Sequence, residues 1–168
     1  MKFDAWFDGS VVTTKNGAPK IVYHSTYTNW RILNLKKVGL GMHFGTYAAA
    51  TDRNKDESYI KMAYLRIINP YVTRDAGTWD EFFLEQLRKD RRFDREKIDK
   101  LLWEEQNNLG LSWDDSKKKW DLAEFRFYNK VRKLIGDAGF DGLLYRNRFE
   151  HKGSISYCVW NADQICFI

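Results

Sequence analysis

The sequence has little cysteine or proline and no long apolar run, and each shortage excludes a class of protein. Of its 168 residues two are cysteines and two are prolines, too few for a disulfide-stapled or a proline-rich chain. No apolar stretch approaches the roughly 20 residues that cross a bilayer. Asp4 and Asp8 stand where a signal peptide would be apolar. We therefore expect a soluble, cytoplasmic protein with no membrane partner.

Motifs of several site classes are also missing. There is no phosphate-binding loop followed by Lys and Ser/Thr, no GxSxG turn, and no GxGxxG with an acidic partner. His24, His43 and His151 do not share helical i, i+4 spacing with another ligand, so no metal site is expected. Cys158 and Cys166 lack CxxC partners and are expected to be buried small hydrophobes, with a single bridge as the alternative.

What is present is the composition of a globular protein. Hydrophobic residues make up 43% of the chain, charged residues 30% and aromatic residues 16%, so we expect one folded domain over residues 1–168 rather than disorder. The net charge of +5 permits an anionic ligand. The oligomeric state stays open.

Local patterns predict an α+β domain with an inserted helical section. A short amphipathic helix around Phe3 and Phe7 is expected to end at Gly9. Alternation and β-branched residues predict strands, and apolar residues at helical spacing predict helices. The expected strands are 20–25, 59–68 (stopped by Asn69-Pro70), 141–145 and 155–160, and the expected later helices are 47–53 (with Thr46 as N-cap), 78–100 and 112–135.

Three segments together carry the functional signal. They are Val22-Tyr23-His24-Ser25-Thr26, the glycine-rich segment 39–46 (GLGMHFGT), and Tyr145–Glu150 (YRNRFE) followed by 156–165 (SYCVWNADQI). In this order they resemble the ADP-ribosyltransferase-like domains of phage and mobile-element polyvalent proteins, whose larger relatives include diphtheria-type toxins and poly(ADP-ribose) polymerases. The resemblance implies a split antiparallel β-sheet whose cleft holds NAD.

The resemblance also implies roles for the first motif. His24 would hydrogen-bond a ribose hydroxyl of NAD and take part in catalysis, and the backbone of Ser25 would hold the nicotinamide amide. Thr26 would flank the same site. Many relatives have glycine where this chain has Ser25, which is tolerable if only the backbone contacts the ligand.

The second motif would shape the nicotinamide pocket. His43 stands where the diphtheria-like branch has a stacking tyrosine, and an imidazole can still stack or donate a hydrogen bond. Phe44 would line the same pocket. Tyr59 is the alternative source of a stacking ring.

The acidic residue is expected in the third motif. Cleavage of NAD at the ribose develops positive charge, which a carboxylate can stabilise. The toxin and polymerase relatives place this glutamate directly before the aromatic residue of the last strand, where this chain has Ser156 before Tyr157. Glu150, in the preceding turn, is therefore the candidate acid, within an Asn-x-x-Glu stretch that the phage-type branch shares.

Ordinary structural roles remain open for each of these residues. His24, expected near the end of its strand, can be a hydrogen-bonded structural histidine, and His43 can satisfy backbone groups. Glu150, among basic neighbours, can form a surface ion pair. Tyr59 and Phe44 can be part of the core.

The function expected from the resemblance is mono-ADP-ribosylation, with NAD as the substrate. The expected acceptor is a macromolecule, a protein before a nucleic acid, with a small molecule or water left open. The chain would be a phage or mobile-element effector acting in the host cytoplasm. The alternative is an inactive module of the same fold that binds NAD, ADP-ribose or a protein. The basic segments 88–95 and 117–120 also permit nucleic-acid binding, although interleaved acids favour solvated helix faces.

Overall fold

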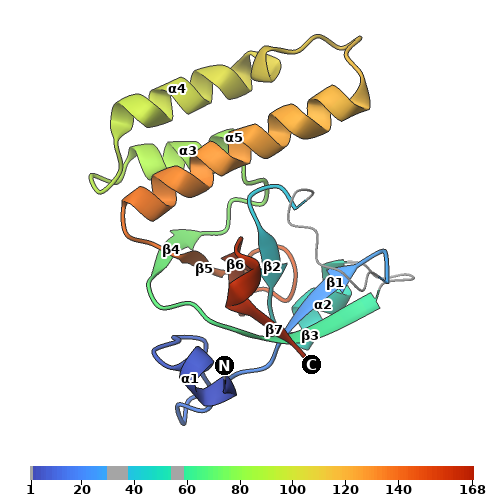
Figure 1. Cartoon of the computed structure of the whole chain (residues 1–168), viewed down its shortest axis with the longest axis vertical. Helices are drawn as coiled ribbons and strands as arrows, with labels where there is room; N and C mark the ends of the chain where they lie inside the picture. Colours follow the sequence, from blue (N-terminus) through green and yellow to red (C-terminus); the bar gives the residue numbers. More distant parts are fainter. Residues whose placement is uncertain (1, 30–37, 54–58) are drawn as a thin grey trace. The chain divides into compact units, whose positions relative to one another are not determined.

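The computed structural model describes residues 2–29, 38–53 and 59–168, and these group into two compact units. The sheet unit comprises residues 2–29, 41–53, 59–75 and 141–168, and the helical unit comprises residues 38–40 and 76–140. Figure 1 shows the elements of both units. The mixture of helices and strands confirms the α+β class.

The strands lie before and after the helical insertion, with two short helices among the first four of them. In chain order they are α1 (Phe3–Phe7), β1 (Val22–Thr26), β2 (Met42–Phe44), α2 (Tyr47–Arg53), β3 (Tyr59–Leu65), β4 (Pro70–Arg74), α3 (Glu81–Arg88), α4 (Arg95–Gln106), η2 (Asn108–Gly110), α5 (Lys117–Asp137), β5 (Gly142–Arg146), β6 (Ile155–Val159), η3 (Ala162–Gln164) and β7 (Ile165–Phe167).

The strands of the sheet unit form two small sheets. One has the order β1-β3-β7 and the other β2-β6-β5-β4. Tyr23 in β1 and Gly45 after β2 exchange two backbone hydrogen bonds of 3.0 and 2.9 Å, which join the sheets at one point. The β4–β5 pair is parallel, which corrects the expectation of an antiparallel arrangement throughout. Its two strands are separated by the whole helical insertion, and a connection of that length allows parallel pairing.

The sheet unit is held by an apolar core and by a capped helix. Val22, Ala63 and Leu65 are fully buried on the paired strands β1 and β3. Helix α2 packs against β1 through its small residues Ala49 and Ala50, which are buried. Thr46 Oγ1 accepts a hydrogen bond of 3.1 Å from the Ala49 amide, which confirms the predicted N-cap.

The expected stop at Asn69-Pro70 was placed wrongly. Strand β3 ends at Leu65, and Pro70 begins β4 instead of ending the preceding strand. Proline suits the first position of a strand, because it has no amide to donate there. The Asp141 carboxylate accepts the Ile68 and Asn69 amides at 2.8 and 2.9 Å, so this connection is a side-chain-capped turn.

The expected helix over 78–100 is two helices. Asp80 accepts the Phe82 amide at the start of α3, and Asp94 accepts the Glu96 and Lys97 amides at the start of α4. The second aspartate therefore begins a new helix inside the region of continuous apolar spacing. The last helix, expected from residue 112, begins at Lys117.

Helices α3 and α4 pack together and α4 packs against α5. Buried aliphatic side chains fill this contact region, among them Leu87, Ile98 and Ile135.

Both cysteines are free, and the predicted burial is confirmed for Cys158 but not for Cys166. Cys158 on β6 is fully buried and Cys166 on β7 is half-buried. Strand β7 was missed in the sequence, because its three residues are too short for a clear alternation. Across the described parts of the chain, no helix combines the length and the hydropathy needed to cross a lipid bilayer.

Candidate functional site

His24 lies in the middle of β1 and not near the end of its strand as expected, because β1 extends to Thr26. It stands beside the point where the two sheets meet. Its Nδ1 lies 2.8 Å from the His43 carbonyl oxygen. Because a carbonyl can only accept, Nδ1 carries the proton and donates it. Burial lowers the pKa of His24, and the nearby positive charge of Arg53 lowers it further, against the opposing effect of this hydrogen bond. The imidazole is therefore neutral at pH 7, and its Nε2 can accept a hydrogen bond.

The side chain of His43 is engaged with β5. Its Nδ1 and the Tyr145 hydroxyl share a hydrogen bond of 3.0 Å. Burial, followed by the charge of Arg53 and the proximity of His24, lowers the pKa of His43 to about 3. Burial raises the pKa of Tyr145, so its hydroxyl stays protonated. This pair is neutral. It links β2 to β5, the two strands that flank β6 in the four-stranded sheet.

The remaining residues of the predicted NAD pocket lie close to His24. Phe44 is almost fully buried, with its ring centroid 5.4 Å from that of His24. Ser25 is buried within β1. Thr26 Oγ1 contacts the backbone of Thr28 at 3.4 Å.

Tyr59 lies opposite Thr26 in the β1–β3 register. It is 47% exposed, so it is accessible to a ligand and is not part of the core.

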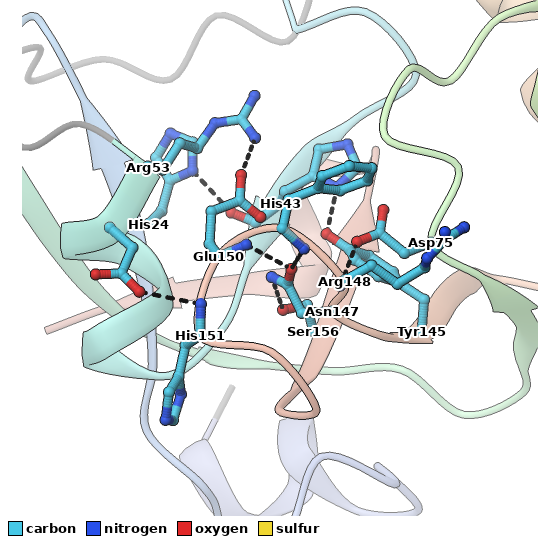
Figure 2. Close-up of polar contacts among 12 residues, drawn as sticks. His24, His43, Arg53, Asp75, Tyr145, Asn147, Arg148, Glu150, His151 and Ser156 are labelled. Atoms are coloured by element: carbon cyan, nitrogen blue, oxygen red, sulfur yellow. Dashed lines mark hydrogen bonds and ion pairs between the residues drawn. The ribbon is translucent and has the colours of Figure 1, made fainter.

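Glu150 belongs to the turn between β5 and β6. Its Oε1 accepts a hydrogen bond of 2.9 Å from Arg53 Nη1, at the end of α2. The Glu150 side chain is 21% exposed and that of Arg53 is 60% exposed, so the pair lies at the surface of the unit. Figure 2 shows the carboxylate and the guanidinium close to the two imidazoles. Beside the larger effect of burial, the charge of Arg53 lowers the pKa of both His24 and His43.

Side-chain oxygens hold the backbone of this turn. Four successive amides donate to them: Arg148 to Asp75 Oδ2 at 2.8 Å, Phe149 and Glu150 to Asn147 Oδ1 at 3.1 and 3.0 Å, and His151 to Asp52 Oδ2 at 3.0 Å. The acceptors come from the end of β4, the end of β5 and helix α2. The position of Glu150 is therefore fixed by three different elements.

Ser156, where the resemblance would lead one to look for a glutamate, lies on β6. It is 2% exposed, and its Oγ accepts a hydrogen bond of 3.3 Å from Asn147 Nδ2. A Cβ added to Gly45 would lie 2.8 Å from this Oγ. The Ser156 hydroxyl is therefore buried and closely surrounded.

The chain matches no protein-family model, no curated protein and no solved structure. The assignment of chemistry therefore depends on the residues of the site.

Sequence reasoning missed Arg53, Asn147 and Asp75. Arg53 pairs with a residue 97 positions away, and no local pattern indicates such a contact. Asn147, in contrast, stands three residues before Glu150, and the Asn-x-x-Glu spacing could have identified it. Asp75 follows β4, a strand that was not predicted.

The arrangement combines three chemical capacities. A neutral imidazole can accept a hydrogen bond from a hydroxyl, a guanidinium can bind phosphate, and a carboxylate can stabilise positive charge or accept a proton. Within the described ranges, no group of three or more His, Cys, Asp and Glu side chains is arranged to hold a metal ion.

Proposed function

We propose that this protein is a mono-ADP-ribosyltransferase that transfers ADP-ribose from NAD to a macromolecule, with a protein as the first candidate acceptor. The observation that carries the proposal is the Glu150–Arg53 pair beside the neutral His24. The order of the three sequence motifs supports it, and so does the division into two small sheets, which fits an ADP-ribosyltransferase-like split sheet.

In this proposal, His24 and Ser25 bind the substrate. The Nε2 of His24 accepts a hydrogen bond from a ribose hydroxyl, and the backbone of Ser25 holds the nicotinamide amide. Tyr59 lines the nicotinamide pocket, the buried ring of Phe44 packs behind His24, and His43 supports the pocket through its hydrogen bond with Tyr145. The guanidinium of Arg53 supplies positive charge that suits the diphosphate of NAD.

Glu150 is the catalytic carboxylate. The bond between the ribose C1′ and the nicotinamide nitrogen breaks, and its electron pair leaves with nicotinamide. The carboxylate stabilises the resulting oxocarbenium-like charge through the ribose 2′-hydroxyl. A lone pair of the acceptor then attacks C1′, and the acceptor's proton passes to Glu150 or to water.

Glu150→Gln tests the assignment, and Glu124→Gln, a change at an exposed glutamate of α5, is the matched control. With NAD and a bacterial lysate as acceptor, we expect Glu150→Gln to release nicotinamide about 100-fold more slowly or worse. Calorimetry should give an unchanged Kd for NAD, because the amide keeps the shape of the side chain. The control should match wild type in both measurements.

Two results would contradict the proposal at different levels. Full activity of Glu150→Gln would remove this residue as the catalytic acid. If the wild-type protein does not bind NAD and His24→Ala changes no ligand measurement, the protein is not an NAD-dependent ADP-ribosyltransferase.

A binding module without turnover is the second candidate. The observation that favours it is the burial of Ser156 at the glutamate position of the relatives, together with the engagement of Glu150 by Arg53. Such a module would bind NAD or ADP-ribose in calorimetry but release no nicotinamide with any lysate. The biological setting that we propose, a phage or mobile-element effector in the host cytoplasm, applies to the active enzyme.

A further inference from the structure

Among the side chains that hold the turn, the buried amide of Asn147 is the one that accepts the Glu150 amide itself. Asn147 is 4% exposed, and its Oδ1 accepts the amides of both Phe149 and Glu150. Its backbone closes the same turn, because its amide donates to Ser154 and its carbonyl accepts from Gly153, each at 2.8 Å. All of these contacts involve residues between β5 and β6, so Asn147 determines the conformation of the turn that follows β5.

Asn147 is itself anchored on the neighbouring strand. Its Nδ2 donates to Ser156 Oγ at 3.3 Å, and both side chains are buried. A buried amide with its oxygen and its nitrogen both engaged has one preferred orientation. Gly45, on the other side of Ser156, leaves space for this hydroxyl, since an added Cβ would approach it to 2.8 Å.

We infer that Asn147 is the positioning residue of the catalytic carboxylate of Glu150. Ser156, on the neighbouring strand, anchors the Asn147 side chain. This inference rests on the proposed function. It gives a defined role to Ser156, which stands where the resembling families have glutamate. Ser156 orients the side-chain amide of Asn147, and Asn147 orients Glu150. Figure 2 shows the chain of contacts from Ser156 through Asn147 to Glu150.

The size of the expected effect follows from the geometry that catalysis needs. A displacement of about 1 Å in a catalytic group can lower the rate about 100-fold. Asn147→Ala removes the shared acceptor of the Phe149 and Glu150 amides, so the Glu150 backbone loses its own hydrogen bond while Asp75 and Asp52 still hold the amides on either side. His24 and Ser25 lie on β1 and do not contact Asn147 through any of these bonds. We therefore expect kcat to fall about 100-fold, with little change in KM or in the Kd for NAD.

A double-mutant cycle separates positioning from general stability. If Asn147 acts through Glu150, the double variant Asn147→Ala/Glu150→Gln releases nicotinamide no more slowly than Glu150→Gln alone. Amide hydrogen exchange at Phe149 and Glu150 should accelerate in Asn147→Ala, a readout that needs no turnover. Asn129→Ala, at an exposed asparagine of α5, is the matched control and should change neither quantity.

Ser156→Ala is the second variant, and it decides the matter if Asn147→Ala does not fold. It removes only the anchor, so we expect a smaller fall in kcat, about tenfold, with faster exchange at the same two amides.

The inference is overturned if the folded Asn147→Ala or Ser156→Ala variant keeps wild-type kcat, or if the losses in the double variant multiply. Its failure is distinguishable from that of the proposed function. An active wild type with an inactive Glu150→Gln and an unaffected Asn147→Ala overturns the positioning role alone, whereas a wild type that binds no NAD overturns both.

Discussion

The two units of this protein differ in where they place their polar side chains. The buried polar or charged residues within the described ranges all lie in the sheet unit: Ser10, Ser25, Asp75, Asn147, Ser156 and Gln164. The helical unit instead carries exposed ion pairs such as Arg88–Asp99 and Lys130–Glu104. Buried polar groups need defined partners and therefore specify geometry, whereas exposed pairs add little beyond solubility. The candidate site lies in the unit with the buried polar groups.

The largest expected change in the free energy of unfolding is at Gln164, and it is compared with a change at another glutamine, Gln106. Gln164 is buried and bonds to three backbone groups, those of Arg66, Asp141 and Asn161. Gln164→Ala should lower the free energy of unfolding by about 3 kcal/mol, because it leaves several buried groups unpaired. Gln106→Ala, at an exposed glutamine bonded to Glu81 in the helical unit, is the control and should change it by less than about 0.5 kcal/mol. Equal losses of unfolding free energy in urea titrations of the two variants would contradict the difference between the two units.

An intermediate effect is expected in the pH dependence of stability. Because burial lowers the pKa of His43 from 6.5 to about 3, the unfolded chain takes up this proton first as the pH falls. The contribution of His43 is thus complete above pH 6.5 and is lost as the pH falls toward 3, by up to about 1.4 kcal/mol per pH unit. His24, whose pKa is also lowered, acts in the same direction.

Urea unfolding at several pH values between 7 and 4.5 measures this slope, and His43→Phe should make it shallower. The helical unit contains no histidine, so it contributes none of this effect. An unchanged slope in His43→Phe would show that the imidazole is protonated alike in both states.

The smallest effect is expected at an ion pair of the helical unit. Lys130 Nζ donates to both oxygens of Glu104 at 2.9 and 2.6 Å, but the lysine side chain is 54% exposed. Lys130→Met keeps the aliphatic stem and should lower the free energy of unfolding by less than about 1 kcal/mol, with the difference shrinking in added salt. A loss as large as that of Gln164→Ala would show that this unit, too, depends on specific polar contacts.

Much of the sheet unit could be predicted because its signals are local. Thr46 as the cap of α2, the alternation around β3 and the strand at β6 all follow from neighbouring residues. The parallel β4–β5 pair could not be predicted, because it joins strands separated by the whole insertion. In the helical unit, continuous apolar spacing concealed the break that Asp94 introduces.

For the candidate site, the sequence by itself determined which residue types were available: an imidazole at His24, a second one at His43, and a carboxylate three residues after Asn147. Those identities follow from short motifs, which the chain carries whether or not it is folded. Only the tertiary structure decided that burial lowers the pKa of His24, that Arg53 pairs with Glu150, and that Ser156 anchors Asn147. Each of these depends on burial or on a contact between distant parts of the chain, and both arise only when the sheets assemble.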